Sequence, residues 1–251
     1  MVELFMLTSE ELTRYSRQLL IPEIGREGQE RLKNARVLLA GVGGLGCSSS
    51  QFLTCAGVGS ITVVDRDTVA LSDLNRQVLY GRDDIGKRKV DVAAERLSRL
   101  NSNVKIYPRF AEITEENASK LLTGIELVVD GLDNLQARFA LNSACVEKGI
   151  PFIYGGIMGL KGMVAAIVPG KTPCLACIYP RIRTHERPFP VLGSVPAIIA
   201  NLQVLEAIKI LTGRYAPSAG RMILFDGGEM TFFRLEIKKN ETCKVCGKEM
   251  R

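Results

Sequence analysis

The segment of residues 35–46, ARVLLAGVGGLG, constrains the fold of this chain more than any other. Its apolar run, residues 37–40, has the length of a strand buried on both faces, and the glycines that follow fit the pattern G-x-G-x-x-G. Gly41 and Gly43 allow a sharp turn and a close approach of bare backbone to a phosphate. A helix expected over residues 45–55 would point free N–H groups at the same place. The pattern therefore predicts a nucleotide site at the end of this strand.

A second apolar stretch, residues 61–64, ends in Asp65, about twenty residues after the glycines. A carboxylate at the end of that strand is well placed to accept hydrogen bonds from ribose hydroxyls. The polar segment 66–77 that follows is too long for a tight turn. Long loops at the carboxyl ends of strands carry the chemistry of doubly wound sheets, so we expect functional residues in this segment.

Predicted helices and strands alternate up to residue 150. The helices are expected over residues 86–101, 114–122 and 135–148, and the strands over residues 104–108 and 125–129. This order predicts an α/β fold with a Rossmann-like, doubly wound and mostly parallel sheet. The strand at 125–129 leads into Asp130-Gly-Leu-Asp-Asn134. Acids there would suit a magnesium ion beside a triphosphate, but Asp133-Asn134 could equally be a helix cap.

The pattern changes after Pro151. Strands are expected over residues 152–157, 162–168, 222–225 and 231–237, with a long apolar helix over residues 196–211. No linker separates the two halves, so antiparallel strands should extend the same sheet. We expect one domain, 1–251, made of N-terminal helices (1–34), a nucleotide-binding half (35–150) and a second half (151–251).

The N-terminal helices are expected over residues 10–20, capped by Ser9 and ended by Pro22, and over residues 27–34. Arg14 and Arg17 lie three residues apart and can project from one helix face. The pattern alone favours two solvated arginines.

The chain has seven cysteines, an odd number that counts against a simple disulfide framework. Four of them form two C-x-x-C pairs, Cys174/Cys177 and Cys243/Cys246, which in a chain without an export signal indicate metal ligands first. The other three, Cys47, Cys55 and Cys145, fall within predicted helices among small or apolar residues, so packing is their expected role.

Composition excludes several classes of protein. The 251 residues are 46% hydrophobic and 24% charged, enough for a full core. The net charge of +6 is spread along the chain, which suits anionic ligands and does not argue for nucleic acid. No apolar run approaches the roughly 18–20 residues of a membrane span, and residues 1–7 are too short for a signal-peptide core. We expect a cytoplasmic protein with no membrane partner.

Seven motifs in order resemble the ThiF, MoeB and HesA family of adenylyltransferases, relatives of the ubiquitin-activating enzymes. They are Arg14-Tyr-Ser-Arg-Gln18, Gly41-Val-Gly-Gly-Leu-Gly46, Asp65-Arg-Asp67, Leu74-Asn-Arg-Gln77, Gly86-Lys-Arg-Lys89, Asp130-Gly-Leu-Asp-Asn134 and the two cysteine pairs. The resemblance spans residues 8–247. It implies a homodimer with two ATP sites, each of which makes an acyl adenylate from a substrate carboxylate and releases pyrophosphate.

The resemblance also implies roles for individual residues. Gly41, Gly43 and Gly44 would approach the phosphates, Asp65 would hold the ribose, and Arg76 and Lys89 would face the triphosphate. Asp133 would hold Mg²⁺, and Arg17 would reach the ATP of the other subunit, which replaces the solvated interpretation. Further ATP contacts fall on the motif members Asp67, Asn75, Gln77, Leu132 and Asn134. The four paired cysteines, Cys174, Cys177, Cys243 and Cys246, match the family's structural Zn²⁺ site, in which closed tetrahedral ligation leaves no position for water.

One departure from the family concerns the loop before the long helix. Many relatives carry a cysteine near the position of His185 or Glu186 that takes part in thioester or persulfide chemistry, but residues 178–195 contain none. Either the enzyme stops at the adenylate, or its substrate is not the usual one. The segment 178–190 is expected to be irregular and carries Arg181, Arg183, His185 and Arg187.

The leading hypothesis is adenylation of the C-terminal carboxylate of a ubiquitin-like sulfur-carrier protein. The alternative keeps the chemistry but takes a peptide or small-molecule carboxylate in cofactor or natural-product biosynthesis, such as the activating step for the pyridinol cofactor of iron hydrogenase. A dinucleotide-dependent oxidoreductase is disfavoured by Gly44, Arg76, Lys89 and Asp133, because NAD needs no magnesium-binding acid. A scaffold without catalysis is disfavoured by the full set of ATP residues.

Overall fold

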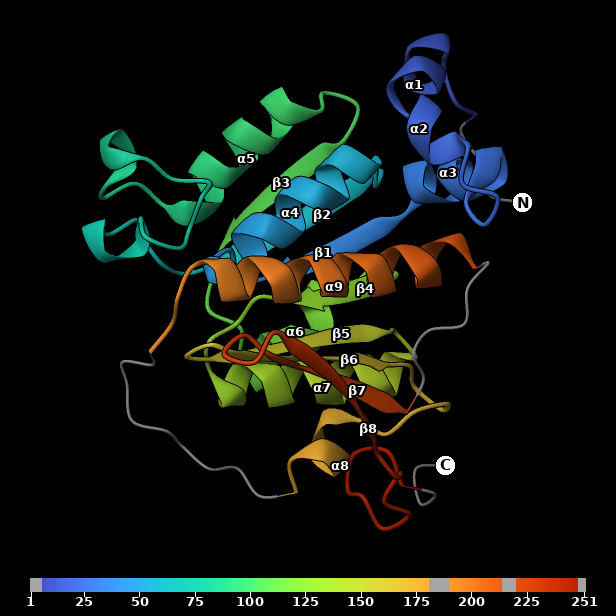
Figure 1. Ribbon diagram of the computed structural model, residues 1–251, viewed down its shortest axis with the longest axis vertical. Helices are drawn as coiled ribbons and strands as arrows, with labels where there is room; N and C mark the ends of the chain where they lie inside the picture. The colour runs from blue at the N-terminus through green and yellow to red at the C-terminus, as the bar shows by residue number, and fades with distance from the viewer. Residues whose placement is uncertain (1–5, 181–189, 214–219, 248–251) are drawn as a thin grey trace.

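The computed structural model describes residues 6–180, 190–213 and 220–247 (Figure 1). Within them one eight-stranded sheet has the order β3-β2-β1-β4-β5-β6-β7-β8. Five strands are parallel: β1 (Arg36–Ala40), β2 (Ser60–Asp65), β3 (Lys105–Phe110), β4 (Leu127–Asp130) and β5 (Phe152–Met158). Three continue it antiparallel: β6 (Lys161–Ile167), β7 (Arg221–Asp226) and β8 (Thr231–Glu236). The predicted architecture is confirmed.

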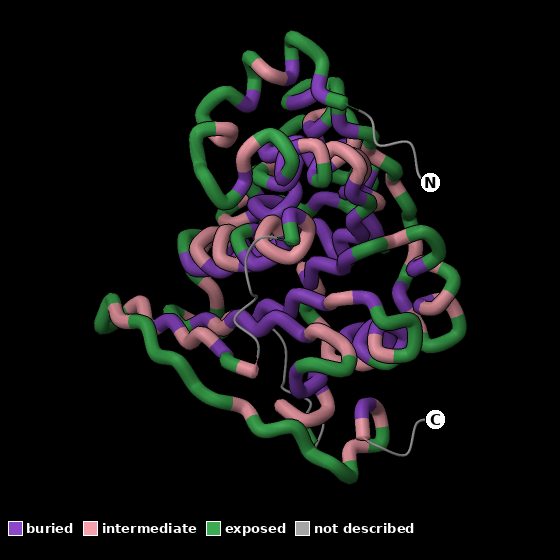
Figure 2. Tube along the Cα trace, turned by 90° about the vertical axis from the view of Figure 1, so that its right-hand side faces the viewer, coloured by how far each residue is buried: buried purple, intermediate pink, exposed green. Residues whose placement is uncertain are grey.

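Helices cover both faces of the sheet because successive residues of β1 bury opposite sides. Val37 and Leu39 face one core, which α3 (Gly25–Asn34), α4 (Gly44–Ala56), α5 (Lys89–Leu100) and α9 (Ser194–Thr212) cover. Leu38 and Ala40 face the second core, which α6 (Glu115–Leu121), α7 (Leu135–Lys148) and the short α8 (Leu175–Ile178) cover. Burial is concentrated in the central strands β1, β4 and β5 between these two layers, whereas β3 and β8 are largely exposed (Figure 2).

The strand order reverses next to β1, which lies between β2 and β4. At this switch point the loops that leave β1 and β4 touch. A Cβ on Gly41 would lie 2.7 Å from the Gly131 carbonyl oxygen, and one on Gly131 would lie 2.5 Å from the Gly41 carbonyl oxygen. Only glycine therefore fits either position, and the two loops form one floor at the carboxyl edge of the sheet, where doubly wound folds bind ligands.

The predicted first helix is wrong at both its start and its continuity. Thr8, not Ser9, caps it, because the Thr8 side chain accepts the Glu11 N–H while the Glu11 carboxylate accepts the Thr8 N–H. The helix then breaks at the buried Tyr15 into α1 (Ser9–Arg14) and α2 (Ser16–Leu19). Asn101 donates a hydrogen bond to the Tyr15 hydroxyl at 2.9 Å, which ties the break to the end of α5.

Helix α9 corrects a second expectation, that no apolar run reaches the length of a membrane span. It has 19 residues, and an 18-residue window within it has a mean hydropathy of 1.5. By length and composition it could therefore cross a membrane, but half of that window is buried within the protein. It packs against α4, β5 and β6. α9 is apolar because one of its faces packs on the core of the sheet.

Candidate active site

The glycine loop between β1 and α4 is shaped for close backbone approach. Gly41 has a positive φ of 85°, and a Cβ on Gly46 would lie 2.0 Å from the Gly41 carbonyl oxygen. The loop can therefore turn only with glycine at these positions, and it delivers the N-terminus of α4 at Gly44. Free helix N–H groups at this edge suit an anion, as predicted from the sequence.

Asp65 at the end of β2 fastens this loop. Its Oδ2 accepts the Val42 N–H at 2.8 Å and its Oδ1 accepts the Asp67 N–H at 2.8 Å. Burial raises the pKa of Asp65, and the two N–H donors oppose the rise. The carboxylate is thus held in place by backbone groups at the predicted ribose position.

The cationic residues of the predicted triphosphate site come together beside the loop. Lys89, the first residue of α5, is 4% exposed, and its Nζ lies 3.4 Å from Asp67 Oδ2. A Cβ on Gly43 would lie 3.8 Å from Gln77 Nε2, and one on Gly44 would lie 3.8 Å from Arg76 Cγ. Arg76 and Gln77, far from the glycines in sequence, therefore lie beside them, and their roles toward ATP stay a prediction.

Asn75 supports its neighbour in this arrangement. Its Oδ1 accepts a hydrogen bond from Arg76 Nη1 at 3.1 Å, and the Ser72 carbonyl accepts a second from the same nitrogen at 2.7 Å. A Cβ on Gly193, the residue before α9, would lie 2.5 Å from the Asn75 carbonyl oxygen. The start of α9 therefore lies directly against the segment that carries Arg76.

The loop after β4 separates the two interpretations of Asp133-Asn134. Asn134 is the N-cap of α7, and its Oδ1 accepts the Ala137 N–H at 2.8 Å. Asp133 is exposed at the same edge of the sheet as the glycine loop. Leu132 donates its N–H to Asp130 Oδ1 at 2.9 Å, which fixes the backbone just before Asp133. The cap is confirmed for Asn134. A metal-binding role for Asp133 stays a prediction.

The sequence interpretation assigned no role to two charged residues here. Asp73 contacts Arg76, Gln77 and Lys89, and Arg138 pairs with the fully buried Asp130 at 2.9 Å. The spacings of three and four residues from Asp73 to Arg76 and Gln77 were visible in the sequence. The contact with Lys89 needed the fold.

Arg17 does not join this group within one subunit. It is exposed on α2, whose neighbour Gln18 bonds to the Ala56 carbonyl at the far end of α4. The site of one chain thus collects two cations and four carboxylates, Arg76, Lys89, Asp65, Asp67, Asp73 and Asp133. These carboxylates would repel a triphosphate, so added positive charge would favour its binding.

The two C-x-x-C pairs meet at the opposite end of the second half. The Cys174 and Cys243 sulfurs are 3.7 Å apart, those of Cys177 and Cys246 are 3.5 Å apart, and all four lie within 4.8 Å of one another. Four thiolates around one Zn²⁺ at about 2.3 Å would lie about 3.8 Å apart. The donor set and its spacing fit zinc, in agreement with the sequence prediction.

The remaining three cysteines differ in their burial. Cys47 and Cys145 are buried, and burial raises the pKa of each to about 12, as expected of packing residues. The prediction is wrong for Cys55, which is exposed in the last turn of α4. It lines an open groove together with Val204 and Leu205 of α9.

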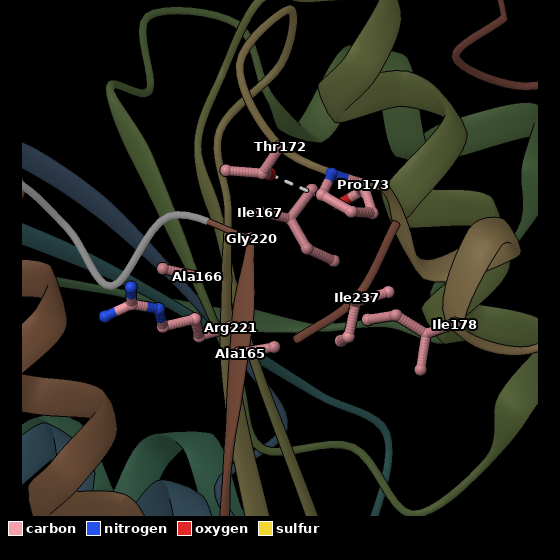
Figure 3. Close-up of a pocket in the computed structure, with 9 residues that line it drawn as sticks. All are labelled: Ala165, Ala166, Ile167, Thr172, Pro173, Ile178, Gly220, Arg221 and Ile237. Atoms are coloured by element: carbon pink, nitrogen blue, oxygen red, sulfur yellow. Dashed lines mark hydrogen bonds between the residues drawn. The ribbon is translucent and has the colours of Figure 1, made fainter. Parts of the chain in front are cut away.

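A small hollow of about 10 Å³ lies away from the glycine loop, lined by residues from β6, the turn that follows it, α8, the start of β7 and the residue after β8 (Figure 3). It is lined mainly by apolar groups, among them Ile167, Pro173, Ile178 and Ile237. This volume is about that of a single water-sized sphere, so the hollow is a packing defect rather than a ligand site. Arg181, Arg183, His185, Glu186 and Arg187 lie outside the described residues.

Comparison with known proteins agrees with this geometry. The chain is 40% identical to the sulfur carrier protein adenylyltransferase of Thermus thermophilus, over 96% of this chain and 93% of that protein. It is 39% identical to the adenylyltransferase and sulfurtransferase MOCS3 of Culex quinquefasciatus, but it spans only 56% of that relative. The crystal structure of E. coli MccB with ATP superposes with a TM-score of 0.82 at 27% identity, over 96% of this chain and 75% of MccB. The ThiF family matches residues 15–245, and the chain belongs to that family.

Proposed function

We propose that this protein is an ATP-dependent adenylyltransferase that activates the C-terminal carboxylate of a ubiquitin-like sulfur-carrier protein. One observation carries the proposal: Arg76 and Gln77 lie beside the glycine loop at the switch point of the sheet, and Asp73 links both to Lys89. The names of the relatives support the same chemistry, because the Thermus protein is named for adenylation of a sulfur carrier.

In the proposed reaction, a carboxylate oxygen of the substrate attacks the α-phosphorus of ATP. The bond from that phosphorus to the bridging oxygen of pyrophosphate breaks, and pyrophosphate leaves with the electron pair. No proton has to move, so the work of the site is in-line positioning and neutralisation of charge. The N–H groups at Gly43 and Gly44 would approach the phosphates, and Asp65 would hold the ribose.

Arg76 and Lys89 would neutralise the charge that develops on the leaving pyrophosphate. Asp67, Asn75, Gln77, Leu132 and Asn134 would complete the contacts with ATP. Asp133, with an exposed carboxylate beside the loop, fits an oxygen ligand for Mg²⁺, which would supply further positive charge when bound. The four cysteines Cys174, Cys177, Cys243 and Cys246 would hold a structural Zn²⁺.

We further propose that the active form is a homodimer in which Arg17 serves the partner's ATP site. The charge of the site supports this, because the four carboxylates named at the site of one chain outnumber its two named cations, Arg76 and Lys89. A groove of about 310 Å³ supports it too, since it lies next to α2 and is lined mainly by apolar side chains. Phe52 of α4 is 50% exposed and Leu205 of α9 is 55% exposed there. A second copy bound at this face would bury both side chains. It would also bring the Arg17 of each subunit toward the ATP site of the other.

A peptide or small-molecule carboxylate is the second candidate substrate. The absence of cysteine from residues 178–195 favours it, and so does the superposition with E. coli MccB in complex with a peptide, MccA-N7isoASN, at a TM-score of 0.85. A cytoplasmic location would be compatible with either substrate. The seven cysteines form no disulfide, which fits such a location.

Exchange of labelled pyrophosphate into ATP tests the activity and the substrate class together. A sulfur-carrier protein ending in Gly-Gly, the same protein with an amidated C-terminus, and a panel of peptide and small carboxylates are compared. We expect exchange only with the free Gly-Gly carboxylate. Exchange with a small carboxylate instead selects the second candidate, and exchange with none of the panel contradicts the proposal.

A further inference from the structure

The last residue of α4, Ala56, is the centre of a small network of hydrogen bonds. Its carbonyl is one of those at a helix end that have no partner within the helix. Gln29 Nε2 donates to this oxygen at 2.8 Å, and Gln18 Nε2 donates to it at 3.2 Å. Gln18 Nε2 also donates to Gln29 Oε1 at 2.7 Å. The two side-chain amides and the carbonyl therefore close a ring of three hydrogen bonds.

The two glutamines belong to different parts of the subunit. Gln29 lies on α3, which packs against α9, and its side chain is 0% exposed. Gln18 is half-buried and lies on the short helix α2. A buried amide is stable only when its hydrogen bonds are made, so Gln29 holds its orientation and offers Gln18 a fixed acceptor. Gln29 thus ties α2 to the body of the subunit.

Helix α2 depends on such ties because it has only four residues, too few to be stable alone. Tyr15, which precedes it, is buried against Gly57, where a Cβ would lie 2.5 Å from the Tyr15 hydroxyl oxygen. Asn101 donates to the same hydroxyl at 2.9 Å. Arg17 lies between the two attachments, Tyr15 and Gln18, and both of them end at the C-terminal end of α4.

We propose that Gln29 is a positioning residue for adenylation at the ATP site of the partner subunit. It holds Gln18 and so fixes the backbone from which Arg17 extends across the interface. The inference rests on the proposed function and its homodimer. A long arginine side chain loses conformational entropy when it is ordered, so a fixed backbone leaves less freedom to lose at the partner's phosphates. Gln29 itself touches no substrate.

The variant Gln29→Met keeps the length of the side chain and removes its hydrogen bonds to Gln18 and Ala56. The rate of pyrophosphate exchange should fall by about tenfold or more, because misplaced catalytic groups carry penalties of that order. The melting temperature should fall as well, since buried hydrogen bonds are lost. A fall in both could also come from damage to the subunit's own ATP site, so the subunits are mixed to find which site is affected.

Two tester variants identify that site. Asp133→Ala impairs the site of its own subunit, and Arg17→Ala removes the guanidinium given to the partner. In a mixed dimer of Gln29→Met with Asp133→Ala, one site has both a native Asp133 and a native α2 from the partner. Activity should therefore rise to about a quarter of the wild-type value after random exchange. With Arg17→Ala, neither site of the mixed dimer is complete, so activity should not exceed the mean of the two separate variants.

Gln203 provides the matched control. It is also 0% exposed, and its Nε2 donates to the carbonyls of Asp130 and Ile153 at 2.8 and 2.9 Å. Gln203→Met removes the same kind of hydrogen bond, but beside the loop that carries Asp133 of its own subunit. It should lower activity at its own site and show the opposite pattern, with recovery when mixed with Arg17→Ala and none when mixed with Asp133→Ala.

The experiment measures pyrophosphate exchange with a Gly-Gly sulfur carrier as the carboxylate. Native mass spectrometry follows dimer formation and subunit exchange, and melting temperatures are recorded for each variant. Recovery of Gln29→Met by Arg17→Ala would overturn the inference, because it would place the defect in the subunit's own site. Activity of Gln29→Met within about twofold of wild type would overturn it too, since the predicted penalty is larger. A Gln29→Met protein that stays monomeric would mean a role in assembly, which also contradicts positioning.

The remaining outcomes are decisive as well. If Gln29→Met does not fold, Gln18→Met breaks the same ring from its half-buried side, and the same two mixtures decide the question. Confirmed exchange between Arg17→Ala and Asp133→Ala without recovered activity would overturn this inference together with the role of Arg17. Wild-type protein without carboxylate-dependent exchange would refute the proposed function itself, a result distinct from failure of the Gln29 prediction in an active enzyme.

Discussion

Gln18 Nε2 donates a hydrogen bond to the carbonyl of Ala56 at 3.2 Å, and this contact fixes α2 against the last residue of α4. The first residue of α4, Gly44, belongs to the glycine loop, about 18 Å away along the helix axis. Arg17, next to Gln18, therefore lies at the wrong end of its own subunit to reach a phosphate. If Arg17 contributes to adenylation, a second subunit must supply it.

Mixing two inactive variants tests this arrangement. Arg17→Ala should remove the charge supplied by the partner, and Asp133→Ala should remove the ligand for Mg²⁺, so each homodimer should be inactive. In a mixed dimer one site carries both lesions and the other neither, so random exchange should restore about a quarter of wild-type activity. Native mass spectrometry confirms the subunit exchange. Confirmed exchange without recovered activity would show that Arg17 does not act across the interface.

The cysteine tetrad should bind one zinc per chain. The spacing of the four sulfurs, all within 4.8 Å, is that of closed tetrahedral ligation. Replacement of Cys243 and Cys246 by serine should release the metal and lower the melting temperature, because the ligands clip the tail to α8. The glycine loop lies on other elements, so ATP binding by the folded fraction should persist. Metal analysis and calorimetry provide the measurements. A Cys174–Cys177 disulfide and no zinc, in protein purified under reducing conditions, would refute the prediction.

The sequence predicted the parts of this molecule that depend on local pattern. The run at Val37–Ala40, with apolar side chains on both faces, could only be an internal strand, and the glycines after it predicted the loop. The pattern could not show that Tyr15 would be buried against Asn101, because that contact joins residues 86 positions apart. The break between α1 and α2 was missed for this reason.

The same limit applies to the site. Asp73 lies in the segment 66–77 singled out for function, yet its contact with Lys89 forms only because the chain folds back through the 3₁₀ turn η2 (Arg82–Asp84). Cys55 was expected to pack because its neighbours are small or apolar. Its exposure depends on the rotation of α4 against α9, which periodicity alone did not determine. Single motifs thus identified candidate site residues, but not the side chains that contact them in the fold.

The buried pair of Asp130 and Arg138 should stabilise the loop that carries Asp133. Arg138 also donates hydrogen bonds to the carbonyls of Leu132 and Gly155, and it lies over the Tyr154 ring at 5.2 Å. Arg138→Met would leave the Asp130 carboxylate buried without its charge partner, at a cost of about 3–5 kcal/mol in the free energy of unfolding. Urea denaturation measures this cost. The double variant Asp130→Asn/Arg138→Met should lose less than the sum of the single variants; strict additivity would show that the pair is not coupled.

No covalent thioester should form on this chain. Residues 178–195 contain no cysteine, burial raises the pKa of Cys47 and Cys145, and the four tetrad cysteines should be bound to zinc. The exposed Cys55 lies about 16 Å along α4 from Gly44. The adenylate should therefore be the last intermediate that the enzyme makes. Denaturing mass spectrometry without reductant, after incubation with ATP and substrate, should show unmodified protein; an ATP-dependent, reductant-sensitive adduct would contradict this.

Transfer of an oxygen isotope tests the acyl adenylate most directly. A Gly-Gly sulfur carrier labelled with ¹⁸O in its terminal carboxylate is incubated with the enzyme and ATP, and hydroxylamine serves as the nucleophile. The masses of the products are then measured by mass spectrometry. Attack of the carboxylate on the α-phosphorus leaves one ¹⁸O in AMP after the acyl group departs, so we predict labelled AMP and unlabelled pyrophosphate. Label in inorganic phosphate with ADP as the other product would mean an acyl phosphate, and would contradict the central claim.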